Sequence, residues 1–204
     1  MNRLHRWYCR SDFWKQHLAE VLLPWAMHGL DLGQDLLEVG PGPGLTTDIL
    51  QRQFERVTSL EIDPRLASAL GQRMQGTNVR VLQGDAAAMP FRDASFSGAV
   101  AFTMLHHVPS AALQDAVLAD VCRVLRPGGT FVGSDSLWSP MFQMFHWFDT
   151  MVAVDPNTFG QRLEAAGFTA VSIEMGERSF RFVARRRNDQ SRVAQSGVRS
   201  PTSR

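Results

Sequence analysis

The stretch Leu36–Leu50, LLEVGPGPGLTTDIL, decides the fold. A short apolar run typical of a buried strand enters a turn with three glycines, and a helix-like run leaves it. Such a turn brings the backbone close to a nucleotide-like ligand. Pro41 and Pro43 lie inside the turn and have no backbone N–H. Two donors of a phosphate cradle are therefore missing, and the turn favours a ligand without phosphates.

The alternative is a dinucleotide site, which uses the pattern G-x-G-x-x-G or G-x-G-x-x-A. Gly40 and Gly42 fill its first two places, but Leu45 stands at the third, and the last glycine of the turn is Gly44. S-adenosylmethionine (SAM) fits the turn better, because its amino-acid carboxylate can use the amides that remain. The chain also lacks a Tyr-x-x-x-Lys pair, since its only lysine is Lys15. An NAD(P)-dependent oxidoreductase is therefore the less favoured alternative.

Strand-like and helix-like runs alternate along the rest of the chain. Strand signals fall at residues 35–39, 56–62, 78–84, 96–102, 130–135, 168–175 and 179–185. Helix signals fall between them at residues 45–54, 64–74, 111–125 and 157–166. This order predicts an α/β sheet with right-handed crossovers, in which ligands bind beyond the carboxyl ends of the strands. The last two strand runs flank a short turn and predict an antiparallel hairpin.

The predicted SAM-binding domain is 36–184, between a helical cap, 1–35, and an arginine-rich tail, 185–204. The cap offers apolar residues for one packed face: Trp7, Phe13, Trp14, Leu18, Val21, Leu22 and Trp25. The tail carries six arginines and one acid and has no apolar periodicity, so we expect it to be disordered. Without the tail, the chain has 15 basic and 19 acidic side chains. That balance argues against a nucleic-acid-binding body.

Composition is that of a globular protein, with 44% hydrophobic and 20% charged residues. No apolar run approaches the roughly 20 residues of a membrane helix, and the first residues do not resemble a signal peptide. The two cysteines, Cys9 and Cys122, lie far apart and match no zinc spacing. We therefore expect a cytoplasmic protein without a metal site or an integral membrane span.

Polar groups at the predicted strand ends complete a cofactor site. Glu61 ends the second strand, where its two oxygens can accept from both ribose hydroxyls of SAM or of NAD. Asp85 follows the third strand and can accept from the adenine amine, while the Ala86 amide can donate to a ring nitrogen. Glu38, inside the first strand, would reach either the loop or the ammonium group of the cofactor. The predicted cofactor contacts are Glu38, Gly40, Pro41, Gly42, Gly44, Glu61, Ile62, Asp85, Ala86 and Thr103.

The ordered motifs LLEVGPGPG, LEIDP, QGDAAAMPFRDASFSGAV, MLHHV and VCRVLRPGGTFV resemble those of class I SAM-dependent methyltransferases. They are similar above all to the small-molecule group that includes the ubiquinone and menaquinone methylases. The resemblance spans about residues 36–135. It implies a Rossmann-like, mostly parallel seven-stranded sheet with an antiparallel last strand, helices on both faces, and SAM over strands one to four. Ser97 departs from the family, which often has Asp there.

Methyl transfer from a sulfonium is an in-line displacement, so the protein must mainly align the reactants and exclude water. His106 and His107, beyond the fourth strand, are candidate general bases if the acceptor needs one. The alternative is that they brace the loop against the next helix. The sequence AFTM lacks the [DNS]-P-P-[YFW] motif of amino-methylating nucleic-acid enzymes. Asp135 alone follows the fifth strand, so the metal-dependent catechol type is not indicated.

The acceptor should meet two less regular segments. Residues 136–155 are dense in Trp, Phe and Met, which predicts either an apolar wall for the acceptor or a core helix. The N-terminal segment adds the only tyrosine of the chain. The candidate acceptor contacts are Tyr8, Trp138, His146 and Trp147.

The resulting hypothesis is a SAM-dependent methyltransferase that acts at oxygen, nitrogen or carbon of a small apolar or aromatic acceptor, such as a quinone, a phenol or a lipid. A non-catalytic SAM-binding protein is the main alternative. Methyltransferases have no obligatory catalytic side chain, so the sequence of an inactive relative need not lack any particular residue. The sequence makes no prediction of the oligomeric state.

Overall fold

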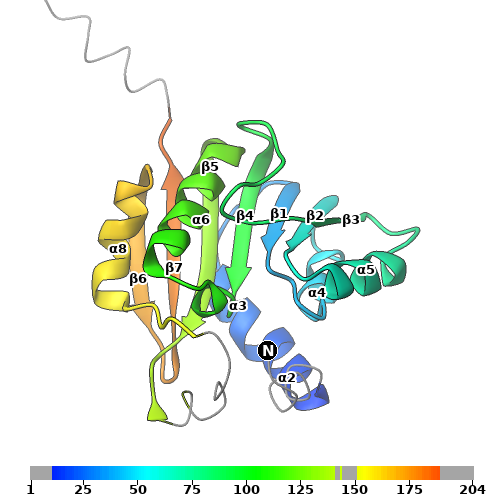
Figure 1. Cartoon of the computed structure of the whole chain (residues 1–204), viewed down its shortest axis with the longest axis horizontal. Helices are drawn as coiled ribbons and strands as arrows, with labels where there is room; N and C mark the ends of the chain where they lie inside the picture. Colours follow the sequence, from blue (N-terminus) through cyan, green and yellow to red (C-terminus); the bar gives the residue numbers. More distant parts are fainter. Residues whose placement is uncertain (1–10, 141–142, 144–150, 189–204) are drawn as a thin grey trace, which may run out of the picture.

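A computed structural model describes residues 11–140, 143 and 151–188. Its centre is one seven-stranded sheet with the order β3-β2-β1-β4-β5-β7-β6 (Figure 1). The strands are β1 (Asp35–Val39), β2 (Arg56–Glu61), β3 (Val79–Gln83), β4 (Phe96–Phe102), β5 (Leu125–Ser136), β6 (Phe168–Met175) and β7 (Ser179–Arg186). The pairs from β3 to β5 are parallel, whereas β7 is antiparallel to both β5 and β6. This order confirms the fold class predicted from the sequence, including the antiparallel last strand.

Helices connect the strands. They are α2 (Asp12–His17), η1 (Leu18–Leu22), α3 (Leu23–Met27), α4 (Thr47–Leu50), α5 (Pro64–Arg73), η2 (Leu105–His107), α6 (Ala111–Val124) and α8 (Pro156–Ala165). Capping residues set where several begin. Asp63 accepts from the Arg65 amide at the start of α5, and Ser110 accepts from the Leu113 amide at the start of α6. None of the helices in the described part of the chain is both long and apolar enough to cross a membrane.

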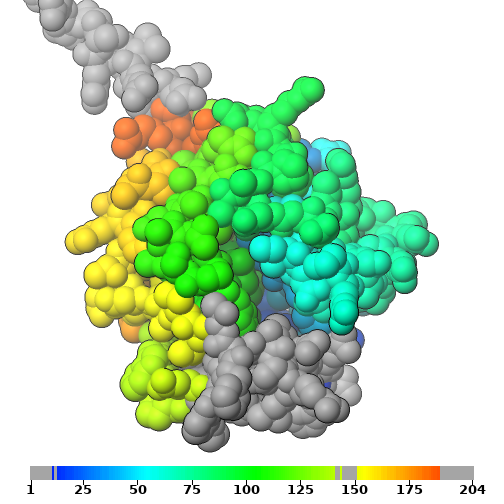
Figure 2. All heavy atoms as spheres, in the orientation of Figure 1, coloured from blue at the N-terminus to red at the C-terminus, as the bar shows by residue number. Residues whose placement is uncertain are grey.

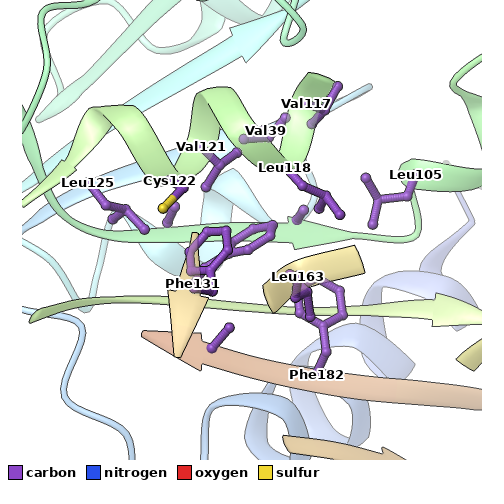
Figure 3. Packing of buried hydrophobic residues seen from close by; sticks show 14 of the residues in the cluster. Val39, Leu105, Val117, Leu118, Val121, Cys122, Leu125, Phe131, Leu163 and Phe182 are labelled. Carbon is purple, nitrogen blue, oxygen red and sulfur yellow. The ribbon is translucent and has the colours of Figure 1, made fainter. Parts of the chain in front are cut away.

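Helices α6 and α8 cover one face of the sheet and enclose a core rich in phenylalanine. Figure 3 shows Phe131 of β5 and Phe182 of β7 between the apolar side chains of α6 and Leu163 of α8. The rings of Phe131 and Phe182 meet edge to face, with their centroids 4.9 Å apart. Edge-to-face pairs of this kind add to the free energy of burial. This core joins the hairpin β6–β7 firmly to the parallel strands.

The N-terminal helices and α4 pack on the other face through the buried residues Leu18, Leu22, Leu23, Ala26 and Leu50. The prediction that Phe13 and Val21 share this packed face is wrong, because they are 70% and 54% exposed. For Val21 the reason lies in η1, a π-helical turn in which the Leu23 amide donates to the Leu18 carbonyl. Such a turn places an extra residue in the helix and rotates the face that follows.

The end of the sheet also differs from the prediction. Strand β7 extends two residues past the predicted domain boundary at 184, through Arg185 and Arg186. The Arg186 guanidinium donates to the carbonyl oxygens of Arg123, at 2.6 Å, and Leu125. These carbonyls at the end of α6 need donors, and Arg186 supplies them. Beyond residue 188, the predicted disordered tail lies outside the described residues.

Strand β6 forms one edge of the sheet. Its pairing with β7 shifts register between Thr169 and Ser172, and Ala170 has a φ of 50°. These features define a β-bulge in the first half of the strand.

Candidate cofactor and acceptor site

The turn after β1 is folded tightly against the end of β2. The Gly40 amide donates to the Leu60 carbonyl at 2.9 Å, and the Gly44 amide donates to the Pro41 carbonyl at 2.9 Å. All three glycines of the turn have positive φ, at 67°, 55° and 84°. Residues with a side chain rarely adopt this conformation, which explains the glycines at positions 40, 42 and 44.

The three glycines face different surroundings. A Cβ on Gly40 would lie 3.0 Å from the Met104 Cβ, and one on Gly44 would overlap the Leu70 side chain. A Cβ on Gly42 would meet no described atom within 4 Å. The turn is therefore packed at both ends and open at its centre, where a ligand can approach the backbone.

Glu61, at the carboxyl end of β2, points at this turn and is 5% exposed. Its Oε2 accepts from the Gly42 amide at 2.9 Å, and its Oε1 accepts from the Asp63 amide at 2.9 Å. These bonds fix the carboxylate beside the open centre of the turn. Its contact with a ribose stays a prediction, as does that of the adjacent Ile62, which is 64% exposed.

Asp85 and Ala86 follow β3 at the same edge. The Gly84 amide donates to the Glu61 carbonyl at 2.9 Å, which places the start of this loop beside the end of β2. The side chain of Asp85 is exposed, and its Oδ1 accepts from the Ala87 amide at 2.8 Å. Because only one of its oxygens is used by this bond, the carboxylate retains capacity to accept from a ligand.

Glu38 is buried beneath the turn. It accepts from the hydroxyls of Thr47 and Ser59, each at 2.7 Å, and from the hydroxyl of Thr46. Burial raises the pKa of this carboxyl, and the three hydrogen bonds oppose that rise. Of the two predicted roles, the structure contains the contact with the loop and helix α4. The sequence analysis missed the three hydroxyl partners, although two of them directly follow the glycine turn.

The end of β4 lies next to the turn. Thr103 has a φ of 50°, and its amide donates to the Ser134 carbonyl of β5 at 2.8 Å. A positive φ is rare for a β-branched residue and is found most often at functional sites. Met104 then packs on Gly40, so β4 and β1 bring Thr103 and the glycine turn to one place.

His106 forms a buried pair with Asp135, at the ends of β4 and β5. Its Nδ1 lies 2.5 Å from the Asp135 Oδ1, and its backbone N–H donates to the Asp135 Oδ2 at 3.2 Å. The side chains are 3% and 0% exposed. The carboxylate holds the imidazole with Nδ1 toward it, and the other ring nitrogen, Nε2, is buried as well. The ring of His107 lies against this ring at a tilt of 46°, with centroids 4.1 Å apart.

A second buried side chain steadies the same turn. Gln114 of α6 donates to the carbonyls of Leu105, at 3.0 Å, and Val152, at 2.9 Å. The Val152 amide donates in turn to the His106 carbonyl at 2.8 Å. The η2 turn is thus held from two sides, which agrees with the predicted bracing role, whereas the role of either histidine as a base stays a prediction.

Of the four predicted acceptor contacts, the structure describes one, Trp138. Trp138 follows β5 and is 58% exposed, as an acceptor wall would require. Tyr8, His146 and Trp147 lie outside the described residues. Figure 2 shows the face of the molecule on which the cyan segments after β1 and the green segments near β4 lie side by side around a recess.

Arg73, at the end of α5, also contacts the turn, which was not predicted from the sequence. Its guanidinium donates to the carbonyls of Pro43, at 2.9 Å, and Gly44, at 3.2 Å, and pairs with Asp48. No sequence signal joins Arg73 to a turn some 30 residues earlier, because the contact depends on how α5 packs.

Comparisons with known proteins agree with this geometry. Residues 37–133 match the family model described as "Methyltransferase domain". Demethylmenaquinone methyltransferase of Tropheryma whipplei is 34% identical over 61% of this chain and 48% of its own. Fatty-acid O-methyltransferase of Mycolicibacterium smegmatis is 32% identical over 56% of this chain and 41% of its own. The chain spans about half the length of these curated relatives.

Among solved structures, the phosphoethanolamine N-methyltransferase 2 of Haemonchus contortus, in complex with S-adenosylhomocysteine, has a TM-score of 0.72. The alignment covers 91% of this chain and 56% of that one, at 14% identity. This likeness shows the shared fold, with the sheet order and antiparallel β7 described above. The family match and the relatives identify residues 37–133 as a methyltransferase domain of the class I SAM-dependent type, and the solved structure shares its fold.

Proposed function

We propose that this protein transfers the methyl group of SAM to a small apolar or aromatic acceptor. The observation that carries the proposal is the open centre of the glycine turn at Gly42, with the Glu61 carboxylate fixed beside it. Asp85 lies at the same edge, one strand further along. The ends of β1, β2 and β3 thus carry, in this order, the glycine turn, the Glu61 carboxylate proposed to bind the ribose hydroxyls, and the Asp85 carboxylate proposed to bind the adenine amine.

The residues fit each part of SAM. The amino-acid end would lie along the glycine turn, the ribose hydroxyls would donate to Glu61, and the adenine would lie between Ile62 and Ala86 with its amine toward Asp85. The methyl group would then face Thr103 and η2. The prolines of the turn favour this cofactor over a dinucleotide, because a pyrophosphate would lose two backbone donors.

The chemistry needs little from the protein beyond alignment. The nucleophile of the acceptor attacks the methyl carbon, the carbon–sulfur bond breaks, and S-adenosylhomocysteine leaves with the electron pair. A hydroxyl acceptor must also lose its proton. His106, oriented by Asp135, is the candidate base in that case, with His107 as the alternative. If both only brace η2, their replacement will lower stability and activity together.

The acceptor class is supported by two observations. The relatives reported above are named for a quinone precursor and for fatty acids, both largely apolar. The exposed ring of Trp138 offers a surface for such a molecule. The excess of acidic over basic groups outside the tail disfavours a nucleic-acid substrate.

The cofactor part is tested by calorimetry. We expect binding of SAM and S-adenosylhomocysteine but not of NAD(P)H. Glu61→Ala should raise the Kd for S-adenosylhomocysteine by about 10- to 100-fold, because two hydrogen bonds to a charged group are lost. Asp85→Ala should raise it by less, about threefold to tenfold, because the side chain is exposed. Glu164→Ala, on the exposed side of α8, is the matched control and should change nothing.

Unchanged affinity in both site variants would show that the cofactor binds elsewhere. The catalytic part is tested by methyl transfer from labelled SAM to a panel of phenols, quinones and fatty acids. Binding of SAM without transfer to any acceptor would favour the non-catalytic alternative. If His106→Gln lowers kcat in an active assay and leaves the free energy of unfolding unchanged, the result would support His106 as a general base.

A further inference from the structure

Arg73, the last residue of α5, reaches the glycine turn from the side of the helices. Its Nη2 donates to the carbonyls of Pro43, at 2.9 Å, and Gly44, at 3.2 Å, while its Nη1 pairs with Asp48 of α4. One guanidinium therefore holds the last two peptide groups of the turn and the helix that leaves it. Its planar fork suits several acceptors at once.

These contacts fix the orientation of two peptide planes. The carbonyl and the N–H of a trans peptide point in opposite directions, and no peptide bond among the described residues is cis. With the Pro43 and Gly44 carbonyls directed at Arg73, the amides of Gly44 and Leu45 must point away from it. The Gly44 amide closes the turn on Pro41. Arg73 thus sets the shape of the backbone that the open centre presents.

The composition of the turn makes this support from outside necessary. Pro41 and Pro43 have no N–H with which to form hydrogen bonds inside the turn. Gly42 adds conformational freedom, and its amide already donates to the Glu61 carboxylate. The carbonyls held by Arg73 are therefore a main constraint on the second half of the turn.

Arg73 also lies where it can be changed without opening the core. Its side chain is 42% exposed and borders a surface pocket of about 360 Å³. The pocket is lined by Pro43, Leu45, Asp48, Leu66, Ala69, Leu70 and Arg73. A shorter or uncharged side chain at this position is thus expected to fold.

We propose that Arg73 is a positioning residue for the methyl donor, which it serves through the backbone of the turn without touching the ligand. The proposal rests on the proposed function, because it takes the turn as the cofactor site. It goes beyond that function by assigning part of the cofactor affinity to a residue on the opposite side of the turn.

The test compares Arg73→Met, Arg73→Lys and Arg80→Met. Arg80 is an exposed arginine of β3 with no ion pair among the described residues, so its replacement removes the same charge away from the turn. We expect Arg73→Met to raise the Kd for S-adenosylhomocysteine about fivefold to tenfold. The Kd of Arg73→Lys should lie between those of the wild type and Arg73→Met, and the Kd of Arg80→Met should equal that of the wild type. In an active assay the KM for SAM should rise with little change in kcat, because the lost interaction acts on binding.

Hydrogen exchange of the unliganded protein keeps this test apart from the test of the proposed function. In Arg73→Met, the amides of residues 42–47 should exchange faster than in the wild type, while those of β4 and β5 stay unchanged. If the wild type binds no SAM, the proposed function fails, and the exchange result still decides whether Arg73 orders the turn. Wild-type affinity in Arg73→Met, or exchange no faster than in Arg80→Met, would overturn the role of Arg73.

Discussion

Two turns at the same edge of the sheet are ordered in opposite ways. The glycine turn after β1 is held through its main chain, by Glu61 on an amide and by Arg73 on two carbonyls. The η2 turn after β4 is held through buried side chains, by Asp135 on His106 and by Gln114 on neighbouring carbonyls. A site made of main chain suits a ligand of constant shape, such as a cofactor. A turn held by buried side chains can change by substitution, which would suit the acceptor side of the proposed site.

The largest effect should come from a side chain placed inside the first turn. Gly44→Val adds a Cβ that overlaps Leu70 at a residue with φ 84°. We expect a loss of about 3–5 kcal/mol in the free energy of unfolding and no measurable binding of S-adenosylhomocysteine. Urea unfolding and calorimetry measure the two effects.

Gly76→Val is the matched control, because Gly76 has a similar φ of 76° but no described atom within 4 Å of an added Cβ. Its cost should be the backbone strain alone, about 1–2 kcal/mol, with affinity unchanged. Equal effects of the two substitutions would contradict the idea that packing, rather than strain alone, shapes the turn.

The second turn should respond in stability and catalysis but not in cofactor affinity. Asp135→Asn removes the charge that accepts from the His106 ring and from two backbone amides. We expect the free energy of unfolding to fall by about 2–4 kcal/mol, because one of the two buried acceptor oxygens becomes an NH2 group that faces a donor. The Kd for S-adenosylhomocysteine should stay within about twofold, since the carboxylate does not support the glycine turn. A large loss of cofactor affinity in this variant would show that the two turns are coupled.

A smaller effect concerns pH and the carboxyl beneath the first turn. Burial raises the pKa of Glu38 above its usual value of 4.5, so the folded state holds this proton more tightly than the unfolded state. The stability gained from it is fully present below pH 4.5 and is lost as the pH rises through the raised pKa. Glu38→Gln should remove this slope, which for one proton is at most about 1.4 kcal/mol per pH unit. Urea unfolding at a series of pH values, with Glu164→Gln as the control, measures it; parallel curves for wild type and Glu38→Gln would contradict the prediction.

The smallest effect should come from Thr103→Gly, at the end of β4. Glycine relieves the strain of φ 50°, but it also increases the entropy of the unfolded chain. The two terms oppose each other, so the free energy of unfolding should change by less than about 1 kcal/mol. Ala94→Gly, at φ 55°, is the control for relief of strain outside the site. A loss of affinity for the cofactor in Thr103→Gly alone would show that the threonine side chain makes a contact of its own.

The sequence predicted the features that depend on neighbouring residues. The strand at Phe96–Phe102 has the predicted bounds, and the glycine turn has the positive φ values that its glycines permit. What it missed depends on distant contacts. The guanidinium of Arg73 reaches the turn only because α5 packs there, and the pair of His106 with Asp135 needs β4 and β5 to be neighbours. Likewise, Phe13 and Val21 are exposed in a segment whose apolar residues alone suggested one continuous face, and Val21 lies in the π-helical turn η1.

The bulge in β6 has a consequence for the behaviour of the molecule in a crowded solution. An edge strand of eight residues offers a row of free backbone groups on which another copy of the chain could stack. Ala170, with its positive φ, breaks that row near its beginning and twists the strand away from a flat template. The edge is thereby shortened as a surface for uncontrolled fibril-like growth, while Thr169 and the residues from Ser172 to Met175 keep their pairing with β7.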